Sequence, residues 1–142
     1  MITDTNEQVQ QIPWLLTRFV QQTPGVSDAV CVSSDGLLMA MSTDLDRARA
    51  DQFAAIAAGL TSLSLGASRC FGYGNVDQLM VEMSTGFLFV ASISDGSCLG
   101  ILADKNSDVG LVGYEMTMLV DRFGSVLTPQ VRAGLRDALA GV

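Results

Sequence analysis

The stretch QLMVEMSTGFLFVASISDGSCLGILA, residues 78–103, decides the fold. It contains three β-prone runs separated only by short turns with a glycine, and these runs are Gln78–Met83, Phe87–Ser94 and Cys98–Ala103. Turns this short join neighbouring antiparallel strands, because a parallel connection needs a long crossover. The stretch therefore predicts a three-stranded antiparallel meander.

An earlier hairpin is predicted upstream of the meander. Two apolar runs, Ala29–Val32 and Leu37–Met41, flank the turn sequence Ser33-Ser34-Asp35-Gly36. Asp-Gly between β-prone runs is a strong local hairpin signal. We expect these two strands to join the meander in one five-stranded sheet.

Helical periodicity appears around and between the strands. Apolar residues recur every three or four positions in four segments, expected as helices: Ile12–Gln22, about Asp51–Arg69, Val109–Phe123 and a short terminal helix within Thr128–Gly141. Asp108 is expected to cap the third helix and Gly124 to end it, while Thr128 and Pro129 suit the start of the last. The stretch Thr43–Asp51 is expected to be a charged loop.

The predicted order is α-β-β-α-β-β-β-α plus a C-terminal helix. This order predicts an α+β fold, with an antiparallel sheet of five strands and helices on its faces. Residues 1–142 are expected to form a single domain, in which residues 1–11 are flexible and residues 127–142 form a helical extension.

Composition excludes several classes of function. The 142 residues include no histidine, so Ser-His-Asp, Cys-His and His-ligated metal chemistry are excluded. A net charge of −7 opposes binding to nucleic acid or to anionic lipid. With neither a signal peptide nor a run of about 20 apolar residues, a cytoplasmic protein without membrane insertion is expected.

Candidate chemical sites are few, and we predict no catalytic residue, cofactor or metal. Asp104, Asn106, Asp108 and Glu115 match oxygen-ligand positions of a calcium loop, but Val109 replaces the glycine that its sharp turn needs. We expect a strand-to-helix loop instead. Asp44, Asp46 and Asp51 are expected in a solvated loop rather than a metal cluster. Gly72-Tyr73-Gly74 is expected to be a simple turn rather than a phosphate-binding loop. The three cysteines favour reduced thiols, with Cys31 and Cys98 buried and only Cys70, beside Arg69, a candidate for reactivity.

The helix expected over Asp51–Arg69 has an unusual surface. Small residues recur every three or four positions and leave most of it uncharged, which allows a second helix to approach closely. Either the sheet and the terminal helix cover both sides of this helix, or two copies of the chain pair through it. We favour self-association, since two-fold dimers are the commonest oligomers. The residues expected in the contact are Ala55, Ile56, Gly59, Ser62, Leu63 and Gly66.

The order of elements and four segments resemble the Roadblock family of dynein light chains and their bacterial relatives. The resemblance runs from about Ile12 to Val126. It rests on the Ala/Gly/Leu-rich helix together with Pro24-Gly25-Val26, Ser34-Asp35-Gly36-Leu37 and the segment DVGLVGYEM, residues 108–116. The chain is similar in particular to actinobacterial members encoded beside small Ras-like GTPases, including the loop Thr43–Asp51 and the C-terminal extension.

The resemblance implies a Roadblock or profilin-like fold and a homodimer. In that dimer the second helices pack antiparallel and the third strands meet edge to edge, which adds Leu79 and Val81 to the expected interface. It also implies a regulator or scaffold of a Ras-like GTPase without catalysis of its own, coupled to a sensor kinase and recruited to the membrane through partners. The GTPase-contacting candidates by position are Arg47, Arg49, Gln52 and Arg69.

A second class of function stays open. Small-molecule sensors with PAS-like or GAF-like topology also build on an antiparallel sheet with helices. A large enclosed apolar cavity would favour such a sensor, whereas the short loops and the lack of convergent polar residues count against it.

Overall fold

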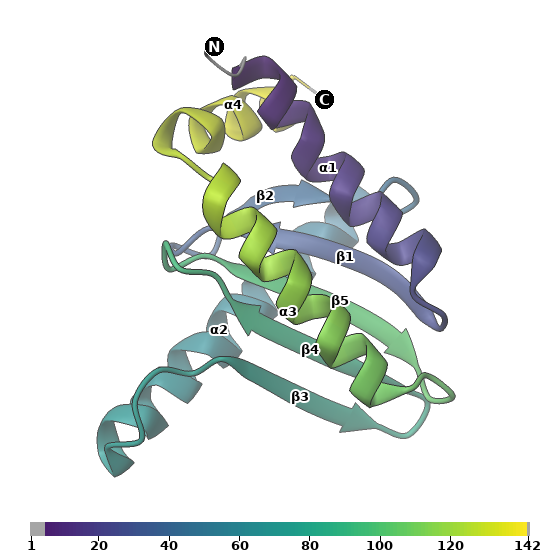
Figure 1. Cartoon of the computed structure of the whole chain (residues 1–142), viewed down its shortest axis with the longest axis vertical. Helices are drawn as coiled ribbons and strands as arrows, with labels where there is room; N and C mark the ends of the chain where they lie inside the picture. Colours follow the sequence, from purple (N-terminus) through teal and green to yellow (C-terminus); the bar gives the residue numbers. More distant parts are fainter. Residues whose placement is uncertain (1–4, 142) are drawn as a thin grey trace.

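The computed structural model describes residues 5–141, in which one five-stranded antiparallel sheet is accompanied by four helices (Figure 1). The elements are α1 Thr5–Gln22, β1 Val26–Val32, β2 Leu38–Met41, α2 Arg47–Phe71, β3 Gln78–Met83, β4 Gly86–Ser92, β5 Cys98–Asp104, α3 Val109–Val126 and α4 Pro129–Ala140. This confirms the predicted fold class and order of elements.

The sheet joins the two predicted hairpin units through its central strand. The strand order is β2-β1-β5-β4-β3, so β5 pairs with β4 of the meander on one side and with β1 on the other. Strands β2 and β3 lie at the two edges. The paired residues Val30 and Gly100 lie at the junction of the two units.

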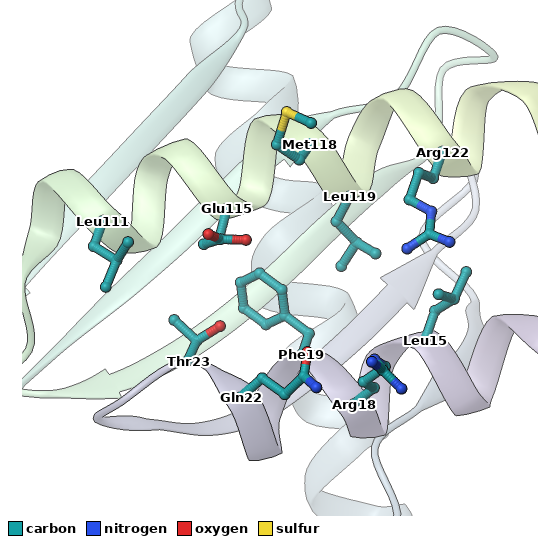
Figure 2. A pocket seen from close by; sticks show the side chains of 10 residues that line it. All are labelled: Leu15, Arg18, Phe19, Gln22, Thr23, Leu111, Glu115, Met118, Leu119 and Arg122. Carbon is teal, nitrogen blue, oxygen red and sulfur yellow. The ribbon is translucent and has the colours of Figure 1, made fainter.

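Helices cover both faces of the sheet. Helices α1 and α3 lie on one face, where Phe19 and Leu119 help to close the core between them (Figure 2). Helix α4 packs against α1 and the β2 edge, and it contributes Val131 and Leu135 to the same core. Helix α2 covers the opposite face and buries Phe53 against the sheet.

Gly100 explains how α2 comes so close to the sheet. A Cβ atom at this position would lie 2.9 Å from the Phe53 ring and 3.0 Å from the Val30 side chain. The glycine therefore leaves the space that the Phe53 ring fills, and this contact fixes the N-terminal half of α2 on the central strands.

Helix α2 is longer at both ends than the sequence pattern predicts. It begins at Arg47, because the Asp46 carboxylate caps it by accepting a hydrogen bond from the Arg49 backbone N–H. The charged stretch Thr43–Asp51 is thus a loop only up to Asp46, and the prediction of a loop beyond that point is wrong. The helix ends at Phe71 rather than near Arg69, where Gly72 adopts a left-handed conformation with φ of 69°.

The other helix boundaries also need correction. Helix α1 starts at Thr5 instead of Ile12, because Val9 on its early turns packs against α4 at Gly134. Residues 1–4 of the segment predicted to be flexible lie outside the described residues. Helix α3 continues through Gly124 to Val126, since one glycine costs a helix only about 1 kcal/mol. The predicted caps at Asp108 and Thr128 are confirmed.

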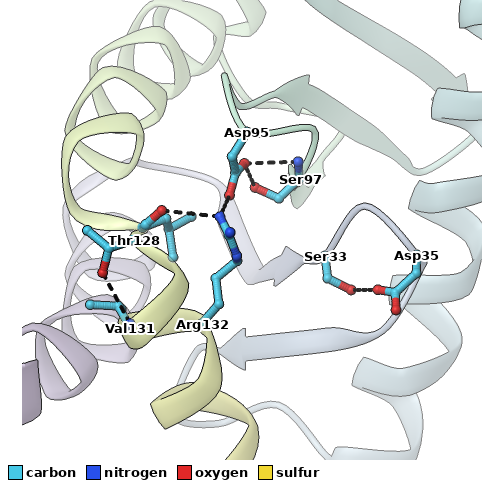
Figure 3. Close-up of polar contacts among 8 residues, drawn as sticks. Ser33, Asp35, Asp95, Ser97, Thr128, Val131 and Arg132 are labelled. Atoms are coloured by element: carbon cyan, nitrogen blue, oxygen red, sulfur yellow. Dashed lines mark hydrogen bonds and ion pairs between the residues drawn. The ribbon is translucent and has the colours of Figure 1, made fainter.

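A polar network ties α4 to the turn between β4 and β5 (Figure 3). The Arg132 guanidinium donates to the Asp95 carboxylate at 2.8 Å and to the Leu127 carbonyl at 3.3 Å. The same carboxylate accepts hydrogen bonds from the backbone N–H and the hydroxyl of Ser97. Burial by itself raises the pKa of Asp95, but the hydrogen bonds from Ser97 and Arg132 outweigh burial and hold this pKa below its usual value.

Replacing Arg132 with methionine is expected to lower the free energy of unfolding by about 1 kcal/mol at neutral pH, because a partly buried ion pair is lost. A carboxyl whose pKa is depressed on folding stabilises the protein above its unfolded pKa, about 3.9, and loses this contribution as the pH falls through the folded value. The difference in urea midpoint between wild type and Arg132→Met should therefore stay constant from about pH 7 to 5 and shrink below about pH 4. A difference in urea midpoint that grows below about pH 4 would contradict the role of the ionised Asp95 carboxylate in this ion pair.

Candidate functional site

The outward side of α2 is an exposed surface without charge. No residue between Gln52 and Ser68 carries a charge, and the face turned away from the sheet is exposed throughout. Ile56 and Leu63 are 51% and 75% exposed. We call this surface the outer α2 face and define it as Ala55, Ile56, Gly59, Ser62, Leu63 and Gly66. The sheet and α4 do not cover it, so the alternative in which both sides of the helix are covered within one chain is wrong.

The C-terminal half of α2 extends past the sheet. Its fully buried residues, Ala50, Phe53, Ala54 and Ala57, all lie in the first half of the helix. The second half projects beyond β3 (Figure 1). On the sheet side of this part, Thr61 and Ser64 hydroxyls donate to backbone carbonyls one turn earlier. A projecting apolar helix without a counterpart in its own chain is typical of a partner-binding surface.

Two glycines on the outer α2 face have no packing role within the chain. A Cβ atom added at Gly59 or Gly66 would meet nothing within 4 Å. Glycine is unfavourable inside a helix by about 1 kcal/mol relative to alanine. The fold of one chain therefore gives no reason for these two destabilising glycines, whereas the close approach of a second helix would.

Strand β3 forms an edge next to the outer α2 face. Among the described strands it pairs only with β4, which leaves backbone groups of its other edge unpaired by a strand. The predicted residues Leu79 and Val81 are half-buried against the cluster under α2. Met80 and Met83, which the sequence did not place in the site, are exposed along the same strand.

Two aromatic residues extend this surface at the end of α2. Phe71 and Tyr73 are 67% and 88% exposed, and their ring centroids lie 6.3 Å apart. They flank Gly72, which turns the chain back toward β3. The sequence interpretation treated this segment only as a turn, although large aromatics beside an exposed glycine are themselves a signal for an interface.

The four predicted GTPase-contacting residues are not gathered in one place. Arg47 and Arg69 lie about 33 Å apart along the helix axis at 1.5 Å per residue. Arg47 is engaged within the chain, because its Nε pairs with Asp51 at 3.2 Å and its guanidinium donates to the Leu139 carbonyl. Arg49, Gln52 and Arg69 are exposed. No ion pair forms at Arg49 or Arg69 within the described residues.

The cysteines follow the predicted division. Cys31 and Cys98 are buried and Cys70 is exposed. Burial raises the pKa of the Cys31 thiol far above its ordinary value, with further contributions from Cys98 and Asp95. Burial also raises the pKa of Cys98, against a smaller opposing effect of a hydrogen bond with Thr61. Both buried thiols are therefore protonated at neutral pH and behave as small apolar side chains.

The loop considered for calcium uses its carboxylates for local structure. Asp104 accepts a hydrogen bond from the Asn106 backbone N–H at 2.8 Å, and Asp108 accepts one from Leu111 at 3.1 Å. These contacts form the strand-to-helix loop and cap that the sequence predicts. Within residues 5–141, no group of three or more acidic, cysteine or histidine side chains is arranged to hold a metal ion.

The most apolar hollow lies between α1, α4 and β2. It has a volume of about 280 Å³ and is lined by residues such as Val9, Met39 and Leu135. Ligand sites for small molecules usually occupy about 300–1,000 Å³ and contain a few convergent polar groups. This hollow is slightly smaller and almost wholly apolar, so it supports the sensor alternative only weakly.

Helix α2 is the one described helix that is long and apolar enough to cross a membrane, with a mean hydropathy of 1.2 over its most apolar window. This is weak support for a membrane span, because core and interface helices have the same properties. Here Phe53 and Ala57 pack on the sheet.

Comparison with known proteins identifies close relatives of this arrangement. A family model described as the Roadblock/LC7 domain matches residues 12–103. One Roadblock/LC7 domain from Streptomyces avermitilis is 41% identical, with a TM-score of 0.75 over 78% of this chain and 92% of that one. A second domain from the same organism is 36% identical, with a TM-score of 0.66 over 79% of this chain and 97% of that one.

More distant structures share the fold. MglB from Myxococcus xanthus is 16% identical, with a TM-score of 0.75 over 82% of this chain and 94% of that one. The gliding protein MglB from Thermus thermophilus is 15% identical, with a TM-score of 0.73 over 89% of this chain and 93% of that one. At this identity the likeness concerns the fold alone. No curated protein matches the chain significantly.

Proposed function

The chain belongs to the Roadblock/LC7 domain family, and from this membership we propose that it is a homodimeric, non-catalytic regulator or scaffold of a Ras-like small GTPase. Its residues 1–142 act as one domain. It works in the cytoplasm, in a signalling complex with a sensor kinase through which it reaches the membrane. The observation that carries the proposal is the uncharged, exposed outer α2 face beside the β3 edge.

The outer α2 face supports an antiparallel helix pair. Gly59 is the middle residue of α2, so a two-fold axis near this glycine would let the helices approach closely while Ile56 and Leu63 supply apolar area. The free β3 edge supports continuation of the sheet into a second subunit. Leu79 and Val81 would then lie beneath the joined helices.

Antiparallel pairing would gather the basic candidates that one chain holds apart. The first turns of one α2 would lie beside the last turns of the other, so each end of the pair would carry Arg47, Arg49 and Gln52 together with the partner subunit's Arg69. Asp51 already pairs with Arg47, so Arg49 and the partner subunit's Arg69 would be left at each end to contact acidic side chains of a GTPase. The GTPase site is therefore complete only in the dimer.

The proposal is tested with a purified Ras-like small GTPase from the same organism. We expect the two proteins to co-elute in gel filtration and the rate of GTP hydrolysis or nucleotide exchange to change when the regulator is added. Native mass spectrometry of the purified chain tests the sensor alternative, because it shows whether a small molecule stays bound. Failure of both GTPase measurements, together with a retained small molecule, would contradict the proposal and favour the sensor alternative.

A further inference from the structure

A groove between α1 and α3 lies on the face of the sheet opposite to α2. It has a volume of about 220 Å³ (Figure 2). Its floor consists of buried apolar side chains, Leu15, Phe19 and Leu119. Leu111 and Met118 on α3 line the groove and are 40% and 47% exposed, so apolar surface reaches solvent along its wall.

Two arginines from different helices line one end of this groove. Arg18 on α1 and Arg122 on α3 both extend toward the space between the helices (Figure 2). Within residues 5–141 no carboxylate is in ion-pair contact with either guanidinium. The Arg18 guanidinium carbon lies 5.1 Å from the centre of the exposed Trp14 ring, so this guanidinium also contacts an aromatic ring.

This local positive charge is unusual for the protein. The chain has eight basic against 15 acidic residues, and ion pairs already occupy three of the basic ones, Arg47, Lys105 and Arg132. Two of the remaining five share one groove. Its lining includes a single acidic residue, Glu115, which projects from α3 nearer to Thr23 and Leu111 than to the arginines (Figure 2).

We propose that this groove docks a segment of a partner protein that presents a carboxylate beside apolar side chains. The carboxylate pairs with Arg18 and Arg122, and the apolar side chains cover Phe19, Leu119 and Met118. Charge complementarity selects this occupant, because the groove offers unpaired guanidinium groups next to exposed apolar surface. The sheet separates it from α2, so this docking leaves the proposed dimer and GTPase surfaces free.

The probe is a short, acetylated and amidated peptide without tryptophan, with aspartates at one end and leucines along one helical face. Its matched control has lysines in place of the aspartates. We expect the acidic peptide to shift the amide resonances of Leu111, Met118 and the residues around Arg18 in the labelled protein. It should also change the emission of Trp14, the single tryptophan of the chain. The lysine peptide should do neither, and added salt should weaken the binding of the acidic peptide.

Replacing both Arg18 and Arg122 with glutamine should weaken peptide binding by about tenfold, as followed by amide shifts. The matched variant Arg136→Gln removes an exposed arginine on α4 and should bind as wild type does. Equal affinity of the double variant would overturn the proposal. It would also be overturned if inorganic phosphate reproduced the shifts around Arg18 and the peptide caused none at Leu111 and Met118, since the groove would then bind anions only.

Discussion

Leu63→Glu is expected to convert the proposed dimer into a monomer. Leu63 is the more exposed of the two large apolar residues on the outer α2 face and lies one helical turn from Gly59, where the two helices are proposed to approach most closely. Pairing would bury the new carboxylate without a cation, because α2 has no charge between Gln52 and Ser68. A buried unpaired charge costs several kcal/mol, which exceeds what a small helix contact can offset. Light scattering should therefore give the mass of one chain.

Two further variants make this result specific. Leu111→Glu introduces the same change at an exposed leucine on the opposite face of the sheet, and it should leave the dimer intact. Gly59→Ala should stabilise the isolated helix by about 1 kcal/mol, since its Cβ meets nothing within the chain, yet weaken the dimer. A Leu63→Glu protein that keeps the dimer mass would show that α2 is not the dimer contact.

Local sequence signals predicted the sheet well because its connections are short. Each hairpin depends on a few residues, such as Asp35-Gly36 and Asp95-Gly96, where glycine adopts a positive φ of 85° or 90°. Strand order follows once β5 joins the two hairpin units. Helix ends were predicted less well, because they depend on contacts between distant residues. Val9 on the early turns of α1, for example, packs against Gly134 of α4, which is 125 residues further along the chain.

The two candidate sites also differ in how well the sequence could predict them. The outer α2 face was predictable because all its residues lie on one helix, and their spacing alone places them together. The groove was not predictable, since Arg18 and Arg122 come from helices at opposite ends of the chain and only the packing of α1 and α3 on the sheet brings them to one place. Phe71 and Tyr73 were missed because the prediction ended the helix at Arg69.

The exposed arginines of α2 can be tested separately from the dimer. Arg49 and Arg69 lie outside the uncharged stretch and form no ion pair within the described residues, so reversing their charge should leave the fold and the dimer mass unchanged. Arg47 is a poorer choice for this purpose. It pairs with Asp51 and donates to the Leu139 carbonyl, and its replacement would also disturb α4.

Arg49→Glu combined with Arg69→Glu is expected to weaken binding of the Ras-like GTPase by at least tenfold, by roughly 1.4 kcal/mol or more. In the proposed dimer each end of the helix pair would carry two glutamates in place of two arginines, so attraction to acidic side chains of the GTPase would become repulsion at both ends. Titration calorimetry at two salt concentrations measures the effect, and the loss should be larger at low salt. The control Arg136→Glu reverses an exposed charge on α4 and should bind normally. Undiminished affinity of the double variant, with its dimer mass retained, would mean that the GTPase docks elsewhere than at the ends of α2.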